Sequence, residues 1–211
     1  MVVNAVVVGV EIEVWRIDLR ADADVALLSG DERARARRYA SEPAARRWRA
    51  ARAGLRTLLG RRLAVDPAAI AFAAGPDGKP YVSSAPLRFN LSHAGDVALV
   101  ALAPAHEVGV DVERLDRRSG AVERALSAGE RAALASAGGA LRHRALLQLW
   151  CRKEALAKAR GSGLGWAPER VDTLAAGDAA LVDLDVGAGY VAALAVLGAD
   201  APLRARLREL R

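Results

Sequence analysis

Apolar and polar residues alternate along two short segments in the middle of the chain, and a continuous apolar run lies between them; the pattern predicts three β-strands. The segments are Leu87–Ser92, Val97–Ala103 and Val108–Glu113, and the polar sequences HAGD and PAHE separate them. A period of two is typical of a strand with one buried face, and short polar connections favour antiparallel neighbours. We therefore expect the three segments to form an antiparallel meander.

Helical periodicity dominates on both sides of these strands. Ser29 is placed to cap a helix that begins near Asp31, and a second helix is expected from about Pro43 to Leu63, with its arginines opposite an apolar stripe. A third helical stretch is expected from Ala121 to Arg160, interrupted around SAGGA. The remaining strands are expected within residues 2–19, near Ile70–Ala73, and at Val171–Leu174, Ala180–Val186 and Tyr190–Val196.

The order of strand, helices and several strands occurs twice. We therefore expect an α+β protein of two similar lobes, each a small antiparallel sheet with helices, with the active-site cleft between them. Pro104 divides the N-terminal lobe, residues 1–103, from the C-terminal lobe, residues 104–211. The duplication is inferred from the order of elements alone, because we identify no sequence identity between the halves.

Charge and composition narrow the classes of function. The 211 residues carry a net charge of +6, and eleven arginines against one acid lie between Arg33 and Arg62. Such a surface favours phosphate, an acidic protein or nucleic acid, and a solvated arginine-rich helix face is the alternative without function. The single cysteine, Cys151, excludes a disulfide framework and a thiolate zinc site. The N-terminal apolar run, broken by Glu11 and Glu13, predicts a strand and no signal peptide, and no stretch is long enough to span a bilayer. We expect a cytoplasmic protein.

Two carboxylates stand out on the third predicted strand. Asp111 and Glu113 alternate with Val108, Val110 and Val112, so both should project from one face, roughly 7 Å apart. Like charges so placed repel each other and do not stabilise an ordinary strand. A hard divalent cation would turn the repulsion into a binding site.

The helix Leu141–Arg160 carries a matching polar row. Trp150, Glu154 and Lys158 follow one another at intervals of four residues, so they share a face. Taken alone, Glu154 and Lys158 could form an exposed helical ion pair worth ~0.3–0.5 kcal/mol. Beside Asp111 and Glu113, however, an all-oxygen set of three acids with an adjacent lysine is typical of a magnesium site for phosphate chemistry.

Two more residues have simple non-functional explanations when each is considered alone. Lys79 lies in a GKP turn and could simply face solvent, and His93, after a predicted strand, could be structural.

The motifs taken together resemble a known family. GKPY, FNLSHAGD, GVDVE and WCRKEALAKARGSGLG occur in this order, and the chain is similar to the 4′-phosphopantetheinyl transferases of the two-lobed, surfactin-synthetase-activating type. The resemblance runs from ERARARRY near residue 32 to GSGLGW near residue 166. It implies transfer of the phosphopantetheine arm of coenzyme A to a serine of an apo acyl or peptidyl carrier protein, with release of adenosine 3′,5′-bisphosphate.

The resemblance also implies roles for individual residues. Magnesium and the pyrophosphate of coenzyme A would be bound by Asp111, Glu113 and Glu154. Lys158 would contact the pyrophosphate and offset the charge that develops during transfer. Glu154 is the candidate general base, directly or through a metal-bound water, although a metal-bound carboxylate has a low pKa and is a weak base.

The remaining contacts concern the nucleotide end of coenzyme A. The resemblance implies that Lys79 and the Gly78–Pro80 backbone, including Pro80, lie near the adenine nucleotide. Phosphate oxygens would be held by Ser92 and His93, with His93 and Arg47 at the 3′-phosphate. The chain departs from many relatives at Ala94, where they carry serine, and at Glu32, where some place a phosphate-binding lysine. The contact of that lysine is either absent or supplied by Arg33 or Arg35.

Two other functions remain open. A metal-dependent nuclease would also use clustered acids and a basic surface, but such enzymes commonly carry E-x-K on a strand, and Arg114 and Leu115 follow Glu113 here. A non-catalytic binder of coenzyme A or nucleic acid would not need three metal ligands. We expect an enzyme that acts as a monomer on an acidic carrier protein, with no membrane partner and with nucleic acid disfavoured.

Overall fold

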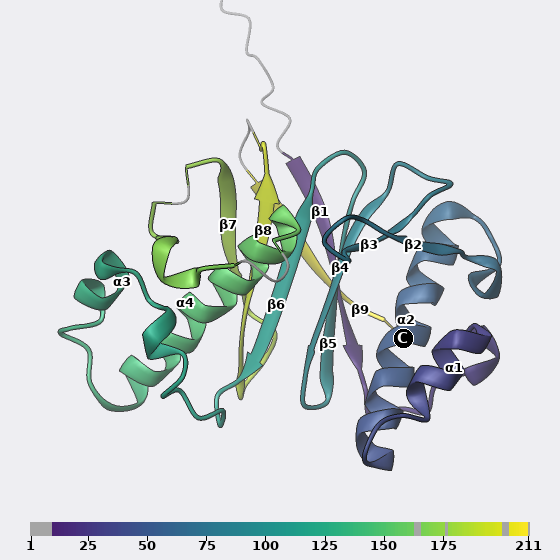
Figure 1. Ribbon diagram of the computed structural model, residues 1–211, viewed down its shortest axis with the longest axis horizontal. Helices are drawn as coiled ribbons and strands as arrows, with labels where there is room; N and C mark the ends of the chain where they lie inside the picture. Colours follow the sequence, from purple (N-terminus) through teal and green to yellow (C-terminus); the bar gives the residue numbers. More distant parts are fainter. Residues whose placement is uncertain (1–9, 163–165, 176, 200–202, 211) are drawn as a thin grey trace, which may run out of the picture.

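Two sheets and two long helices form the body of the protein (Figure 1). The computed structural model describes residues 10–162, 166–175, 177–199 and 203–210. The first half of the chain contains β1 (Val10–Asp18), α1 (Gly30–Ala36), α2 (Glu42–Leu63), β2 (Phe72–Ala74), β3 (Pro80–Val82), β4 (Arg88–Ala94) and β5 (Val97–Ala103). The second half contains β6 (Val108–Arg114), α3 (Ala128–Ala133), α4 (Gly139–Arg160), β7 (Ala179–Leu184), β8 (Tyr190–Leu197) and β9 (Leu203–Glu209). Turns of 3₁₀-helix lie at Val25–Leu27, Pro67–Ala69, Glu123–Ala125 and Pro168–Arg170.

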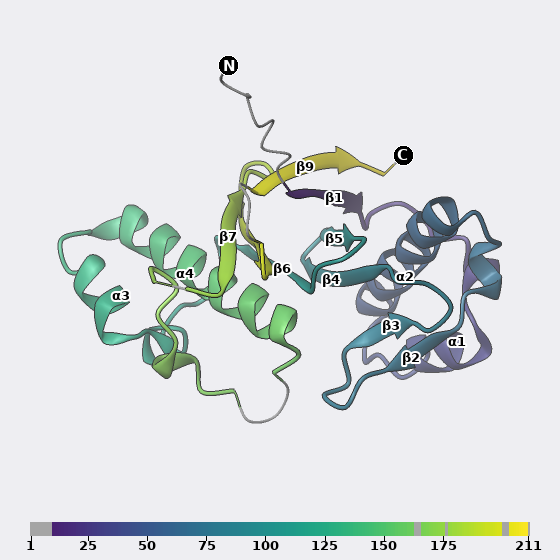
Figure 2. The ribbon, with the colours of Figure 1, turned by 90° about the horizontal axis from the view of Figure 1, so that it is seen from above.

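The elements stack in four layers, which confirms the expected α+β class with two lobes. One sheet has the order β4-β5-β1-β9 and the other the order β6-β8-β7, while β2 and β3 form a separate hairpin. Figure 2 shows the sheets in the middle of the molecule, with α1 and α2 on one side and α3 and α4 on the other. Three apolar clusters join these layers, between α2 and the first sheet, between the two sheets, and between the second sheet and α4.

The predicted meander is right for two strands and wrong for the third. β4 and β5 form an antiparallel hairpin, with His93 opposite Ala98. β6 instead leaves this sheet and pairs with β8, with Asp111 opposite Ala193. The reason is burial on both faces: the valines of β6 pack against the first sheet, and its other face packs against α4. Local alternation detects such a strand but does not identify its partner.

The structure differs from the expectations at two further places, and other parts of them lie outside the described residues. Val171–Leu174 is a turn and no strand, because Thr173 and its neighbours are held by side-chain hydrogen bonds, including one from Thr173 Oγ1 to Glu130 Oε1 at 2.7 Å. The last strand, β9, was not anticipated; it pairs in parallel with β1, so the C-terminal half contributes a strand to the first sheet and that sheet is not purely antiparallel. The part of the first predicted strand in residues 2–9, and Gly163–Gly165 of the GSGLGW motif, lie outside the described residues.

The two lobes also share a sequence repeat that we had not identified. LSGDERA at residues 28–34 and LSAGERA at residues 126–132 agree at five of seven positions, and they lie 98 residues apart. The same offset of 98 aligns VEIEVWRID at residues 10–18 with VGVDVERLD at residues 108–116. The duplication is therefore visible in the sequence as well as in the order of the elements.

The repeated segments build the same structure in each lobe. Ser29 and Glu32 form a capping box at the start of α1, and Ser127 and Glu130 form one at the start of α3. Glu32 Oε2 accepts a 2.7 Å hydrogen bond from Arg56 Nε of α2, and Glu130 Oε2 pairs with Lys153 Nζ of α4 at 2.8 Å. Each lobe therefore fastens a short helix to its long helix through a buried ion pair.

Candidate active site

A glycine brings β6 and α4 into close contact. A Cβ atom at Gly109 would lie 1.9 Å from the carbonyl oxygen of Ala155 and 2.5 Å from the backbone nitrogen of Ala159. Any larger residue would push the helix away, because real Cβ atoms do not approach backbone so closely. The glycine of GVDVE thus lets α4 lie directly on β6, which places Lys158 beside Asp111.

Asp111 is the buried centre of the site. Its Oδ1 accepts hydrogen bonds from Ser92 Oγ at 2.8 Å and from Lys158 Nζ at 2.6 Å. Its Oδ2 is buried and has no hydrogen-bond partner among the described residues. A buried carboxylate oxygen without a partner is costly, so Asp111 Oδ2 is suited to a cation that the protein alone does not supply.

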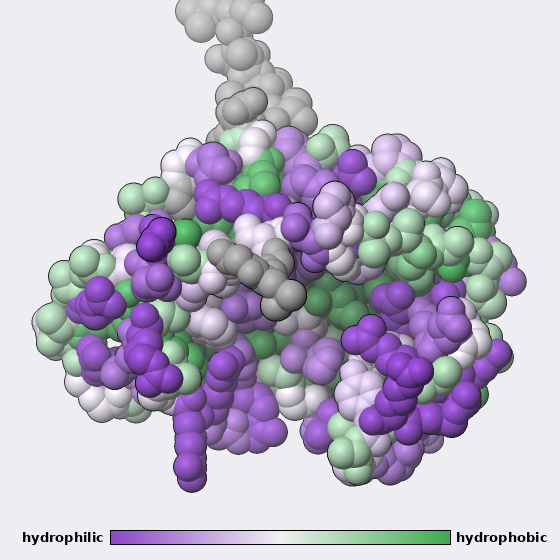
Figure 3. Space-filling model, viewed as in Figure 1, coloured by the Kyte–Doolittle hydropathy of each residue, from purple (hydrophilic) through white to green (hydrophobic). Residues whose placement is uncertain are grey.

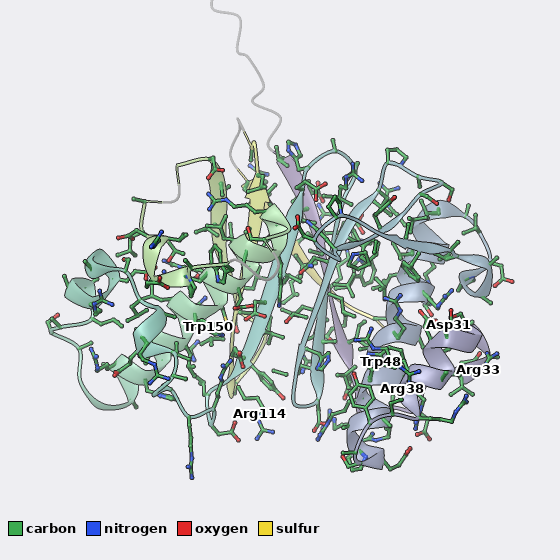
Figure 4. All side chains as sticks on the ribbon, in the orientation of Figure 1. Asp31, Arg33, Arg38, Trp48, Arg114 and Trp150 are labelled. Carbon is green, nitrogen blue, oxygen red and sulfur yellow. The ribbon has the colours of Figure 1, made fainter. Side chains whose placement is uncertain are left out.

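Glu113 lies near the end of the same strand, and its contacts come from Trp150 and Arg117. Its Oε1 accepts a 3.2 Å hydrogen bond from Trp150 Nε1 and forms an ion pair with Arg117. The Arg117 guanidinium carbon also lies 5.5 Å from the centre of the Trp150 ring. Figure 4 labels Trp150 on α4 and Arg114 at the end of β6, which mark this side of the site. The contacts involve only Oε1 and leave Oε2 available.

Glu154 is half-buried and is not hydrogen-bonded within the described part of the chain. Burial and repulsion from Asp111 raise the pKa of the Glu154 carboxyl, and Lys158 and Arg117 offset this only in part. A cation bound at this buried point would stabilise the charged carboxylate and lower this pKa.

The donor atoms of the three carboxylates suit a hard divalent cation, but the positions of the three side chains do not yet form a metal site. All their donors are oxygens, as Mg²⁺ prefers. In the described residues, however, no three His, Cys, Asp or Glu side chains are arranged to hold a metal ion. Lys158 and Arg117 instead neutralise Asp111 and Glu113. Binding of a metal would therefore require rotation of the Glu113 and Glu154 side chains.

Both lobes line the hollow above this cluster. A cavity of about 370 Å³ is bounded on one side by the turn Asp77–Pro80 and by Asn90, and on the other by Glu154, Ala157 and Lys158. A second hollow of about 450 Å³ shares Gly78 and Pro80 with the first. It is lined by Trp48, Arg35, Arg52 and His93 among others. In Figure 3, hydrophilic side chains gather along the lower half of both lobes on this face.

The structure places Ser92 and His93 on opposite faces of β4, and of the two only His93 lines a hollow. Ser92 is buried and connects the lobes, since its hydroxyl donates to Asp111 and accepts a 3.1 Å hydrogen bond from Lys158 Nζ. His93 points to the other face of β4 and lines the second hollow. Loss of water around the ring, together with the nearby charge of Lys158, lowers the pKa of His93.

The other residues expected to contact coenzyme A are Arg47, Lys79 and Pro80, and two of these side chains are engaged by protein acceptors. Arg47 Nε donates a 2.7 Å hydrogen bond to Asp96 Oδ1 in the β4–β5 turn, and Arg47 does not line the hollow that contains His93. Lys79 lines the first cavity through its turn, but its ammonium group donates to protein acceptors. Pro80 borders both hollows.

Glu32 and its neighbours explain one departure from the family pattern. Glu32 is buried and pairs with Arg52 and Arg56, so it holds α1 on α2. Arg33 donates to the carbonyl of Leu28. Arg35 instead lies 5.7 Å from the Trp48 ring centre and lines the hollow with His93. Of the two arginines proposed to replace the lysine, Arg35 is the one placed for a phosphate.

One further residue was not singled out from the sequence. Asn90, inside the FNLSH motif, is buried, and its Oδ1 accepts a 2.9 Å hydrogen bond from the backbone nitrogen of Val110. This bond links β4 of one lobe to β6 of the other, next to Asp111. A buried amide at an inward position of the strand pattern is the signal that could have identified it.

Comparison with known proteins gives the same assignment for both halves. Residues 107–209 match the family model for the 4′-phosphopantetheinyl transferase superfamily, and residues 18–105 match the model for 4′-phosphopantetheinyl transferase, N-terminal. The chain is 32% identical over 173 residues to the 4′-phosphopantetheinyl transferase HetI of Nostoc sp., which covers 76% of the chain and 73% of HetI. The chain belongs to the 4′-phosphopantetheinyl transferase superfamily.

Other members of the superfamily match over a smaller share of their length. Identity to the putative 4′-phosphopantetheinyl transferase slr0495 of Synechocystis sp. is 35% over 145 residues, which is 66% of the chain and 59% of that relative. Identity to the 4′-phosphopantetheinyl transferase AcpT of Salmonella typhimurium is 37% over 122 residues, or 56% of the chain and 62% of AcpT. The chain thus spans about three fifths of these two relatives.

Proposed function

We propose that this protein transfers 4′-phosphopantetheine from coenzyme A to a serine of an acyl or peptidyl carrier protein, as an enzyme of the two-lobed type. The observation that carries the proposal is the unpartnered Oδ2 of Asp111, buried beside Lys158 and Glu154. A cleft lined by both lobes adjoins this cluster. Membership of the superfamily gives the class of reaction.

The residues around the cleft have different proposed roles. Asp111, Glu113 and Glu154 would hold Mg²⁺, which supplies Lewis-acid stabilisation of charge on phosphate oxygens when bound. Lys158, fixed by Asp111 and Ser92, presents a positive charge to the pyrophosphate. The serine oxygen would form a bond to the phosphorus that carries pantetheine, the bond from that phosphorus to the bridging oxygen would break, and adenosine 3′,5′-bisphosphate would leave with that oxygen.

Glu154 is the proposed acceptor of the proton of the attacking serine. Burial and Asp111 raise its pKa in the metal-free protein, and a bound cation would lower it again, so the support for this role is the position of the carboxylate and not its pKa. It also borders the cavity from the α4 side, where a serine hydroxyl could approach. Glu154 can thus contribute both a negative charge and a site for the proton.

The nucleotide end of coenzyme A is proposed to follow the second hollow. The Gly78–Pro80 backbone borders both hollows and would lie near the base, and Arg35 and His93 would hold the 3′-phosphate. Arg47 could join them by leaving Asp96. Ser92 would donate to a phosphate oxygen if its bond to Asp111 opens.

The proposal extends to the partner and the setting. An acidic carrier domain suits the basic α1–α2 surface. A monomer is proposed because one chain supplies both walls of the cleft. A cytoplasmic location is proposed because a single cysteine is atypical of a secreted disulfide framework. Among the helices that the structure describes, none has the length and apolar character to cross a bilayer.

The test is an intact-mass assay on a panel of apo carrier proteins. Incubation with coenzyme A and Mg²⁺ should add the phosphopantetheine mass to at least one carrier, and omission of coenzyme A should prevent it. Chelation should stop the reaction, and Mg²⁺ should restore it. Absence of any mass shift across acyl and peptidyl carriers would refute the proposal, and cleavage of plasmid DNA by the same preparation would favour a nuclease instead.

A further inference from the structure

Lys79, in the turn between β2 and β3, donates to three protein acceptors. Its Nζ lies 2.7 Å from Glu107 Oε2, 3.0 Å from the carbonyl oxygen of Val108 and 3.0 Å from the carbonyl oxygen of Ala159. A lysine ammonium group has three N–H donors, so all of them are used. The side chain is only 18% exposed, and no donor is left for a ligand in this arrangement.

All three acceptors belong to the other lobe. Glu107 and Val108 lie where β6 begins, and Ala159 lies in the last turn of α4. The final carbonyl groups of a helix lack partners within the helix and carry a partial negative charge, so a cation stabilises them. Lys79 therefore joins the β2–β3 hairpin to the strand of Asp111 and to the helix of Glu154 and Lys158.

The turn that presents Lys79 is fixed locally. Gly75 N donates to the carbonyl of Lys79 at 2.9 Å, Gly78 N donates to the carbonyl of Gly75 at 2.9 Å, and Gly78 adopts a positive φ of 78°. The turn can thus move as a unit, and its position relative to α4 depends on contacts such as those of Lys79. Two cavities flank the lysine, the one beside Glu154 and Lys158 and another of about 340 Å³ beside Arg88 and Glu107.

We infer that Lys79 is a positioning residue, which fixes the hairpin that lines the coenzyme cleft against the helix that carries Glu154 and Lys158. This inference rests on the proposed function only for its effect on coenzyme A. A direct contact between the ammonium group and the coenzyme would require Lys79 to leave all three acceptors, two of which are carbonyl groups of the buried residues Val108 and Ala159. The carbonyls of Val108 and Ala159 would then lose their charged donor, which is costly in a partly buried site.

Glu107 provides the means to separate these two roles. If Lys79 positions the hairpin, removal of Glu107 takes away one of its three contacts and should have a smaller effect in the same direction, and its removal from a protein that already lacks Lys79 should add little. If Lys79 contacts the coenzyme directly, removal of Glu107 should leave the ammonium group free to bind and should not weaken binding. Arg88 is the matched control. Its Nε lies 2.8 Å from Glu107 Oε1, but among the described residues it forms no hydrogen bond with the other two acceptors of Lys79, the carbonyl groups of Val108 and Ala159.

The first measurement uses the protein without coenzyme. Lys79→Met, Glu107→Ala, the double variant and Arg88→Ala are compared with the wild type by hydrogen–deuterium exchange. Amides of the β2–β3 hairpin and of the last turn of α4 should exchange faster in the first three proteins and at wild-type rates in Arg88→Ala. Unchanged exchange in Lys79→Met would overturn the inference even if the protein catalysed no transfer, so this test is independent of the proposed function.

The second measurement is calorimetric titration with coenzyme A, followed by steady-state kinetics. Lys79→Met should weaken binding about tenfold, Glu107→Ala should weaken it by a smaller factor, and the double variant should match Lys79→Met, because Glu107 acts on the hairpin through Lys79. Both KM and kcat should change, since the hairpin and α4 shift together. A raised KM with unchanged kcat in Lys79→Met alone would indicate a direct contact, and an unchanged KM with lowered kcat would indicate loss of folded protein. Either result would overturn the inference.

Discussion

The two oxygens of Asp111 have different environments, and this difference defines the site. Oδ1 is held by Ser92 and Lys158, whereas Oδ2 is buried without a partner in the described structure. A side chain that served only to pair with Lys158 would leave its second oxygen in solvent or satisfied by the backbone. The geometry therefore favours a ligand at Oδ2.

Asp111→Asn should abolish most transfer without unfolding the protein. The amide preserves the shape and can still accept from Ser92, but it removes the charge that holds a divalent cation, so the rate should fall by about 10²–10³-fold or more. Initial rates by carrier mass analysis, with the thermal midpoint as a check on folding, measure this effect. The exposed Asp116→Asn is the control, and near-normal transfer by Asp111→Asn would mean that the metal site is misplaced.

His93 should make coenzyme A binding dependent on pH. Desolvation, and after it the charge of Lys158, lower the pKa of His93 from its ordinary value in the free protein. A 3′-phosphate beside the ring would raise this pKa, so binding should take up protons, and affinity should fall as pH rises from the lowered free pKa through the raised bound pKa.

Calorimetry in buffers of different ionisation enthalpy measures the proton uptake. The phosphate titrates near neutral pH as well, so the decisive comparison is with His93→Gln, which should take up fewer protons. With 3′-dephospho-coenzyme A the wild type and His93→Gln should behave alike. Equal proton uptake by both proteins with coenzyme A itself would place the 3′-phosphate elsewhere.

The pairing of β6 with α4 sets the distance between the acidic strand and the Glu154–Lys158 row. Gly109→Ala should therefore impair the site through the helix, since the added methyl group meets the backbone of Ala155 and Ala159. Overpacking of this kind costs about 1–3 kcal/mol or more. Urea unfolding should show this loss, and the remaining folded protein should transfer more slowly because Lys158 is displaced from Asp111.

Gly120→Ala is the control for this change, because nothing lies within 4 Å of a Cβ atom at Gly120. It should match the wild type in stability and rate. A Gly109→Ala protein as stable and active as Gly120→Ala would show that α4 can move away without consequence.

Local chemistry allowed most elements to be predicted, and long-range pairing limited the rest. The Ser29 cap, the start of α2 near Pro43 and the end of α4 at Arg160 followed from cap residues and periodicity, and all three are confirmed. The partner of β6 was not predictable from its own alternation, because both possible neighbours present apolar residues. β9 was missed although Leu203, Ala205 and Leu207 alternate with arginines, which is the period of a strand with one covered face; its parallel pairing with β1, far away in the sequence, is not visible from that alternation.

At the scale of the whole molecule, the buried ion pairs show how each lobe is held together. Glu130 and Lys153 are completely buried, and Lys153 Nζ also donates to the carbonyls of Pro168 and Val171. In the first lobe, Arg56 pairs with Glu32 and donates to the carbonyls of Pro67 and Ile70. The repeat that encodes these pairs was overlooked because it survives in two short segments, and because Lys153 stands beside Glu154 in a motif that we assigned to catalysis.

Lys153→Met should destabilise the protein by roughly 3–5 kcal/mol, because it leaves the Glu130 carboxylate buried without a cation. The neighbouring Arg152→Met, which removes a partly exposed pair with Asp183, should cost no more than about 1 kcal/mol. Replacement of both partners, as Lys153→Met with Glu130→Leu, should recover part of the loss, since an apolar pair leaves no buried charge. Urea unfolding of the four proteins tests these values, and equal stability of Lys153→Met and Arg152→Met would contradict them.

The same variants separate the two lysines of the W-x-x-K-E-x-x-x-K motif. If Lys153 only holds the lobe, transfer by Lys153→Met should fall in proportion to the folded fraction, with KM for coenzyme A unchanged. Lys158→Met should show the opposite result, a large loss of rate at nearly full stability, because Lys158 is 28% exposed and faces the cleft. A rate loss in folded Lys153→Met as large as that in Lys158→Met would instead place both cations in the chemistry.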